Sequence, residues 1–251
     1  MDRVVALSNT LIIVLWVIWL IVWTAAAFFV KRTQHKEPLG AILYERVPVV
    51  MGFLLLVLPM RHPLPLAKEL ATLHNLSGGR LILGVGVGWL EPEFAALGVP
   101  FHERGRRMDE GIAMMRAVWT QDPVTFKAKY IAAEIEGLTM QPQPVSPIPL
   151  WIGGSSEPAL ARTVRIADGW HGSGLTPEKA APLIKRLRGD RPDDDFTISI
   201  RWHWDGKDAG VLRAHVDAFA AVGVQHLLVG PVNRDVDDWD GVIEGVGRLI
   251  R

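Results

Sequence analysis

The chain contains no cysteine among its 251 residues, which excludes disulfides, thiolate nucleophiles and cysteine-based metal sites. Its charges balance, with 27 basic and 27 acidic side chains, so no basic excess favours nucleic acid as a partner. The sequence also lacks HExxH, paired-histidine, GxSxG and phosphate-loop motifs. Metalloprotease, hydrolase and nucleotide-hydrolysing functions are therefore unsupported, and we expect no metal site.

One long apolar segment is present near the N-terminus. Residues 11–30 read LIIVLWVIWLIVWTAAAFFV, and about 20 apolar residues in a helix span the hydrocarbon core of a bilayer. Basic residues follow the segment, so the positive-inside bias predicts a single-pass membrane protein whose remaining chain is cytoplasmic. A cleaved signal peptide is the alternative, but the run is longer than usual and the charges lie on the wrong side. We predict an anchor over 1–32 and a linker over 33–46.

From residue 47 onward, short apolar runs alternate with amphipathic segments, which is typical of β/α repeats around a parallel sheet. Six strands are expected, near residues 53, 84, 151, 168, 198 and 228. A closed (β/α) barrel has eight strands, so the α/β domain over 47–251 is predicted to be an incomplete TIM-type barrel. The long segment 121–149 is expected to be a connection. Helices are expected at Pro65–Leu76, Arg104–Thr120, from Pro158, from Thr176, Asp208–Val222 (closed by Gly223) and Asp237–Ile250.

Several motifs in this region resemble those of the luciferase-like monooxygenase family. They are LPMRHP at 58–63, LSGGRLILGVGVGW at 76–89, FHERGRRMDE at 101–110, PLWIGGS at 149–155 and ADGWH at 167–171. The resemblance covers about residues 45–230 and is closest to the branch that uses the deazaflavin F420, with the FMN-using branch as the alternative. It implies a TIM-type barrel that holds its cofactor at the carboxyl ends of the strands and acts on a small organic substrate. Because relatives are often dimers, it also implies a homodimer.

The segment Gly153-Gly154-Ser155-Ser156 joins an expected strand to an expected helix. The N–H groups at a helix N-terminus and two hydroxyls suit a phosphate group. Taken alone, these residues favour a plain tight turn with a serine cap. With the family resemblance, we interpret them as the cradle for a cofactor phosphate.

Other residues expected to contact the cofactor, from their places in these motifs, are Gly52, Gly84, Gly86, Gly88, Trp89, Asp168 and Gly169. The three spaced glycines leave room for a flat ring against the backbone, although close packing between a strand and a helix is the alternative. Gly52 lies where F420-using relatives have a bulge under the ring, but the Phe53 and Leu54 that follow it are bulkier than usual there.

Three further side chains are candidates for chemistry. His171 follows an expected strand and is interpreted as a proton donor near the ring, against the alternative of a structural histidine. Arg106 and Arg107 suit an anionic substrate or cofactor tail. As solvated charges on an amphipathic helix, the two arginines need no function.

The sequence therefore predicts an F420- or FMN-dependent oxidoreductase or monooxygenase anchored to the cytoplasmic face of a membrane. The alternative is a catalytically inactive remnant, because the family's first two β/α units have no counterpart before Val47. A gene truncation joined to unrelated upstream sequence explains both the missing units and the apolar segment.

Overall fold

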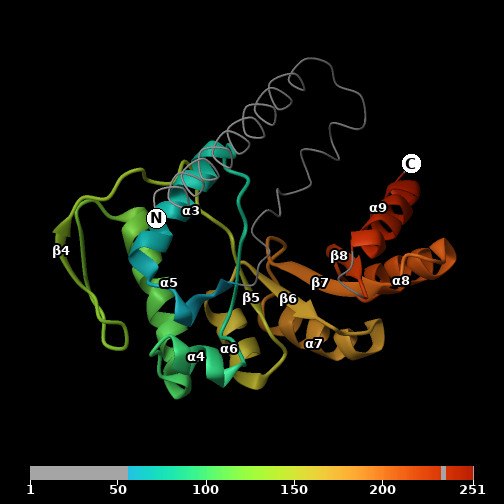
Figure 1. The fold of residues 1–251 in the computed structure, drawn as a ribbon, viewed down its shortest axis with the longest axis horizontal. Helices are drawn as coiled ribbons and strands as arrows, with labels where there is room; N and C mark the ends of the chain where they lie inside the picture. Colours follow the sequence, from blue (N-terminus) through green and yellow to red (C-terminus); the bar gives the residue numbers. More distant parts are fainter. Residues whose placement is uncertain (1–55, 233–235, 251) are drawn as a thin grey trace, which may run out of the picture. The chain divides into compact units, whose positions relative to one another are not determined.

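The computed structural model describes residues 56–232 and 236–250, all within the second of the two units into which the chain divides, Val49–Arg251. Its centre is a six-stranded sheet whose neighbouring strands are all parallel, in the order β1-β2-β5-β6-β7-β8 (Figure 1). The six expected strands are therefore confirmed, although residues 49–55 of the first lie outside the described residues. The strands are β1 (Leu56–Val57), β2 (Leu83–Gly86), β5 (Leu150–Gly153), β6 (Gly169–Ser173), β7 (Thr197–Trp204) and β8 (His226–Pro231).

Helices connect successive strands of this sheet, as a parallel arrangement requires. They are η1 (Leu58–Met60), α3 (Pro63–Leu76), α4 (Glu91–Ala96), η2 (Phe101–Glu103), α5 (Arg104–Thr120), α6 (Glu157–Ile166), α7 (Pro177–Asp190) and α8 (Ala209–Ala221). A further helix, α9 (Val236–Ile250), follows the last strand, β8.

The ends of these helices follow local signals in the sequence. The Thr176 hydroxyl accepts the Lys179 N–H at the start of α7, and the Asp208 carboxylate accepts the Gly210 N–H at the start of α8. Gly223 follows α8 with a φ of +92°, a left-handed conformation that glycine adopts at little cost. The expected boundaries of α7 and α8 are thus confirmed to within a residue or two.

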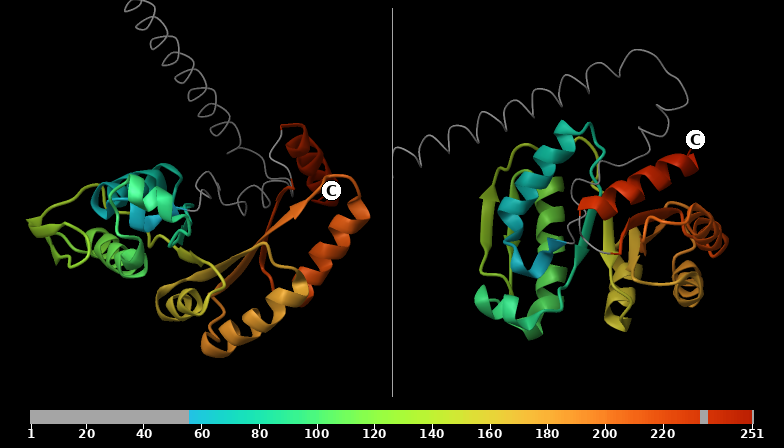
Figure 2. Two further views of the ribbon diagram at one scale, coloured as in Figure 1. Left: turned by 60° about the horizontal axis from the view of Figure 1, so that its bottom comes forward. Right: turned by 45° about the vertical axis from the view of Figure 1, so that its right-hand side comes forward.

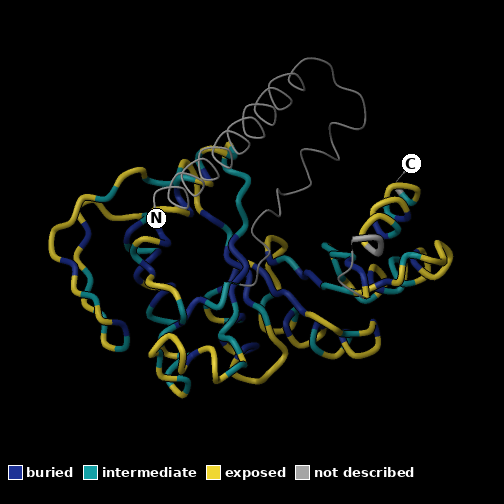
Figure 3. Tube along the Cα trace, viewed as in Figure 1, coloured by how far each residue is buried: buried dark blue, intermediate teal, exposed yellow. Residues whose placement is uncertain are grey.

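The helices bury one face of the sheet. On β2 and β5, alternate residues such as Val85 and Ile152 pack against α3 and α5. On β6 and β7, Trp170, Ile198 and Ile200 pack against α6, α7 and α8. Figure 2 shows α7 and α8 along the same side of β6 to β8, and Figure 3 shows the buried positions concentrated in the strands. Because side chains alternate along a strand, the residues between these positions point to the opposite face.

The segment 121–149 is not the plain connection that the sequence predicts. It contains an antiparallel pair, β3 (Val124–Lys127) and β4 (Glu134–Leu138). The loop joining the two strands docks on α5, where the Glu110 carboxylate accepts the N–H groups of Tyr130 and Ile131, each at 2.7 Å. The charged face of α5 therefore binds this loop, and sequence patterning alone did not reveal it.

Two element boundaries also differ from expectation. The strand expected from Ile166 begins at Gly169, because α6 continues through Ile166. The strand expected at Phe196–Ile200 continues to Trp204, where it pairs with the end of β8.

None of the helices within 56–232 and 236–250 is both long and apolar enough to cross a membrane. The predicted anchor over residues 11–30 and the expected cofactor contact Gly52 lie outside the described residues.

Candidate functional site

The face of the sheet opposite the helices is polar and carries the candidate site. On β7, Thr197, Ser199 and Arg201 alternate with the apolar residues that face the helices. On β6, His171 and Ser173 occupy the same face. A strand buried on both faces would be apolar throughout, so this alternation marks a polar lining.

One row of residues runs in register across five strands of this face, and we call it the central row. On β2 and β5 it consists of Gly86 and Gly153, one residue beyond the paired residues Val85 and Ile152. It continues through His171, which pairs with Gly153, then Ser199 and His226 on β6, β7 and β8. The first two positions present only backbone, and the last three present a histidine, a serine and a histidine.

The three polar side chains of the central row are joined by hydrogen bonds. His171 Nδ1 lies 2.9 Å from Ser199 Oγ, and the same oxygen lies 3.0 Å from His226 Nδ1. His171 is 2% exposed and Ser199 is fully buried. The indole ring of Trp151 meets His226 edge-on, with ring centroids 5.2 Å apart.

Burial and neighbouring charge keep these imidazoles neutral. Desolvation is the largest cause that lowers the pKa of His171 to about 3, and the positive charge of Arg201 and the nearby His226 act in the same direction. Burial also lowers the pKa of His226. Arg201 Nη2 donates to Ser173 Oγ at 3.1 Å, so a fixed positive charge lies on the same face, two residues beyond Ser199.

The turn Gly153–Ser156 lies between β5 and α6, as expected. The indole Nε1–H of the buried Trp170 donates to the Gly154 carbonyl at 2.8 Å and so fixes the path of the turn. Gly154 has a φ of +113°, and a Cβ there would lie 3.2 Å from the Ala159 Cβ, so glycine is required. Ser155 and Ser156 are exposed, and the Ser156 side chain forms no capping hydrogen bond with α6.

Asp168 and Gly169 lie at the opposite, amino end of the strands. The Asp168 carboxylate accepts the Leu150 N–H at 2.8 Å and lies 3.8 Å from the Arg116 guanidinium, so it fastens β5 to β6. A Cβ at Gly169 would lie 2.6 Å from the Trp151 ring, which gives this glycine a packing role. The structure does not bring these two residues to the turn Gly153–Ser156.

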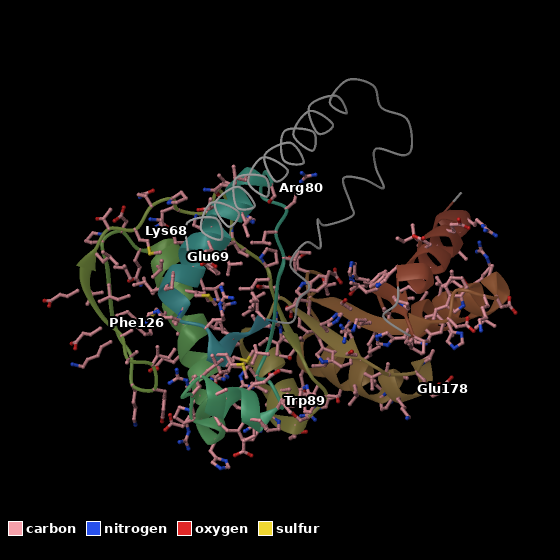
Figure 4. The ribbon with its side chains drawn as sticks, viewed as in Figure 1. Lys68, Glu69, Arg80, Trp89, Phe126 and Glu178 are labelled. Atoms are coloured by element: carbon pink, nitrogen blue, oxygen red, sulfur yellow. The ribbon has the colours of Figure 1, made fainter. Side chains whose placement is uncertain are left out.

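The remaining glycines of the expected site divide into two groups. Gly84 and Gly86 lie on the polar face of β2. A Cβ at Gly88 would lie 2.6 Å from Val57 Cγ1 and 2.9 Å from the Phe94 ring, so close packing accounts for it. Trp89 is 81% exposed, and Figure 4 shows it and Arg80 at the two ends of the segment that contains β2.

Arg106 and Arg107 lie on α5 beside the β3–β4 loop rather than on the polar face of the sheet. The Arg107 guanidinium donates to the Tyr130 carbonyl, and the Arg106 guanidinium lies 5.5 Å from the centre of the Tyr130 ring. These contacts give both arginines a role in holding the loop.

Sequence reasoning missed three residues of the polar face: Ser199, Arg201 and His226. The signal that was available is the alternation in TISIRWHW at 197–204, where a polar residue follows each apolar one. That pattern is typical of a strand with one polar face. In the part of the chain that the structure describes, no three histidine or acidic side chains come together as a metal site would require.

Comparison with known proteins gives matches over most of the chain. A family model for luciferase-like monooxygenases matches residues 22–236, which extends nearer the N-terminus than the motifs do and includes the predicted linker and residues 22–32 of the predicted anchor. An uncharacterized protein of Mycobacterium tuberculosis is 35% identical over 202 residues, which cover 80% of this chain and 68% of that protein. An FMNH2-dependent dimethylsulfone monooxygenase of Pseudomonas putida is 31% identical over 186 residues, which cover 72% of this chain and 49% of that enzyme. The chain thus spans about two thirds of the first relative and about half of the second.

Among solved structures, an F420-dependent secondary alcohol dehydrogenase in complex with an F420–acetone adduct matches with a TM-score of 0.62 over 76% of both chains. At 18% sequence identity this likeness shows the fold alone. It confirms the predicted α/β architecture of the TIM-barrel type.

Proposed function

Because the chain belongs to the luciferase-like monooxygenase family, we propose that it is an oxidoreductase that binds coenzyme F420, with FMN as the alternative cofactor. Its substrate is proposed to be a small organic molecule. The observation that carries the proposal is the central row, in which two bare glycine backbones adjoin a buried histidine. When bound, a flavin or deazaflavin supplies hydride transfer or oxygen activation, and the protein binds and orients it.

The residues near the carboxyl ends of the strands fit such a group. Gly86 and Gly153 would hold the ring system, since neither residue has a side chain of its own on this face. The turn Gly153–Ser156 would hold an anionic tail through the N–H groups and hydroxyls at the start of α6. Arg201 adds positive charge on the same face.

His171 is proposed as the residue that donates a proton near the ring. It adjoins Gly153 in the central row, and its pKa of about 3 keeps the imidazole uncharged throughout the physiological range. A neutral imidazole both donates and accepts a hydrogen bond, which suits proton exchange with a substrate.

A cofactor titration of the full chain in detergent tests this proposal. We expect saturable quenching of F420 fluorescence at micromolar concentrations. Gly154→Ala is expected to weaken binding by about tenfold, because a side chain at a φ of +113° strains the turn. Gly137→Ala is the matched control, since Gly137 is also left-handed (φ +59°) but a Cβ there meets nothing within 4 Å.

Two outcomes of the titration would change the proposal. Binding of FMN instead of F420 would keep an oxidoreductase and replace its cofactor. A folded chain that binds neither cofactor would contradict the enzymatic function and favour the inactive remnant.

We also propose that residues 11–30 anchor the chain in a membrane, with the barrel on the cytoplasmic side. The apolar length of the segment and the basic residues after it support this proposal. The full chain is expected to remain in membranes washed with carbonate, whereas the double variant Ile18→Arg/Ile21→Arg is released, because charges at the bilayer centre are costly. Release of the unaltered chain by carbonate would rule the anchor out.

A further inference from the structure

In the central row, His171, Ser199 and His226 are joined by two hydrogen bonds that the proposed chemistry does not by itself require. Ser199 lies between two imidazoles that belong to the strands on either side of it, and both of its neighbours approach through Nδ1. The pairing of β6 with β7 and of β7 with β8 places the three residues directly opposite one another. Their alignment is therefore set by the backbone of the sheet.

The number of protons shared by these atoms fixes which nitrogen of each imidazole ring is protonated. A serine hydroxyl has one proton and can donate it to only one of the two Nδ1 atoms. The other Nδ1 must then carry a proton and donate it to the serine oxygen. Burial disfavours the charged form of both histidines, so each ring carries a single proton. The two neutral rings must accordingly be opposite tautomers, one protonated at Nδ1 and the other at Nε2.

We propose that His171, Ser199 and His226 form a proton relay that runs across the polar face, away from the glycines of the central row. A proton that arrives at His171 Nε2 is balanced by transfer of the His171 Nδ1 proton to Ser199 Oγ. The serine proton passes to His226 Nδ1, and the His226 Nε2 proton leaves. One N–H bond forms and one breaks on each ring, and no charge accumulates. In the reverse direction His171 Nε2 donates its proton to the substrate while His226 Nε2 takes one up, which restores the starting tautomers.

A cavity lies next to residues that adjoin the relay and would give it a route toward solvent. Trp151 contacts His226 and also lines a cavity of about 350 Å³ at the amino ends of the strands. Thr197, two residues before Ser199, lines the same cavity. The acidic side chains Asp168, Asp193 and Asp195 are also part of its wall, so the cavity is polar and would pass a released proton to solvent. On the other side of the relay, the positive charge of Arg201 disfavours a second proton on the His171 ring, so a proton exchanged at His171 Nε2 must be balanced through Nδ1 and Ser199.

The inference rests on the proposed function, because a relay needs a reaction that supplies or consumes a proton. Ser199 and His226 are positioning residues in this scheme, since they act through His171. A buried serine that merely fills space would also lower stability when replaced. The tests must therefore include measurements that a structural role does not affect.

The first test needs no cofactor and uses ¹⁵N-histidine NMR on the full chain in detergent. We expect one ring of the pair to be protonated at Nδ1 and the other at Nε2, with exchange broadening shared by both Nδ1 signals. Ser199→Ala should abolish this shared broadening, whereas Thr163→Val, which removes another buried hydroxyl, should leave it unchanged. Two rings of the same tautomer would overturn the relay.

The second test uses the protein loaded with whichever cofactor binds. In Ser199→Ala and His226→Asn, we expect kcat to fall by about 100-fold, within the range of general acid–base effects, while cofactor affinity changes little. The His226→Asn variant keeps a hydrogen-bonding group near the position of Nδ1 but cannot pass a proton on, so it carries the test if Ser199→Ala does not fold. The solvent deuterium isotope effect on kcat should indicate that several protons are transferred in one step in the unaltered enzyme and fewer in both variants. An unchanged kcat and isotope effect would refute the relay, whereas failure of the unaltered chain to bind any cofactor would refute the proposed function and leave the NMR result to decide.

Discussion

Asp109→Ala is expected to lower the free energy of unfolding by about 3–5 kcal/mol, the cost typical of leaving a buried charge without its partner. Arg162 is 8% exposed, and its Nε and Nη2 donate to the two Asp109 carboxylate oxygens at 2.7 and 3.2 Å. Removal of the carboxylate leaves the guanidinium with only backbone carbonyls as acceptors, at Gly105 and Pro158. Denaturant unfolding followed by tryptophan fluorescence measures the change.

The position of this ion pair connects it with the candidate site. Asp109 is on α5 and Arg162 is on α6, whose first turn follows Gly153–Ser156. Loss of the pair should therefore also weaken cofactor binding, although neither residue lies in the turn.

Asp217→Ala, on the exposed side of α8, is the control for the stability measurement and should change the free energy of unfolding by less than about 0.5 kcal/mol. The double variant Asp109→Leu/Arg162→Met should regain most of the loss, since it leaves no buried charge. A double variant no more stable than Asp109→Ala would contradict this explanation.

The folded chain is expected to lose about 2 kcal/mol of stability at pH 5 relative to pH 7.5 through His171 alone. Burial lowers the pKa of His171 from 6.5 to about 3 in the folded state, so the unfolded chain binds the proton more readily. The contribution is fully present above pH 6.5 and is lost as the pH falls toward 3. His171→Asn keeps a polar group beside Ser199 but cannot titrate, so its stability should depend less on pH over this range. Unfolding free energies of both proteins, measured at several pH values between about 4 and 8, give the comparison.

The half-buried His215 provides the control for this experiment. His215 lies on α8, where its ring stacks on Trp202 with centroids 4.3 Å apart, and it is more accessible than His171. His215→Asn should retain the pH dependence of the unaltered chain. If His171→Asn keeps that dependence as well, His171 is not the group responsible.

The elements of the fold could be predicted from the sequence because their signals are local. The Thr176 cap, the Asp208 cap and Gly223 mark helix ends through contacts within a few residues. The apolar runs near 84, 151 and 228 mark strands for the same reason. Strand number and parallel order follow from their alternation with helices.

The candidate site could be predicted only in part. The turn Gly153–Ser156 and His171 were recognisable, because each belongs to a continuous motif. Asp168 belongs to the same motif as His171 but lies at the other end of β6, where it accepts the Leu150 N–H. A motif lists neighbours along the chain, and a strand carries those neighbours to different ends and faces of the sheet.

The sequence by itself determined the β/α repeats, the helix ends and the glycine turn before α6, because periodicity and capping act over short distances. Only the tertiary structure decided that Glu110 and Arg107 hold the β3–β4 loop, and that His226 shares a serine with His171. These contacts join residues that are 20 to 28 positions apart in sequence. They depend on the register between strands and on how the loop docks against α5, which the pairing of the sheet and the packing of the core fix together.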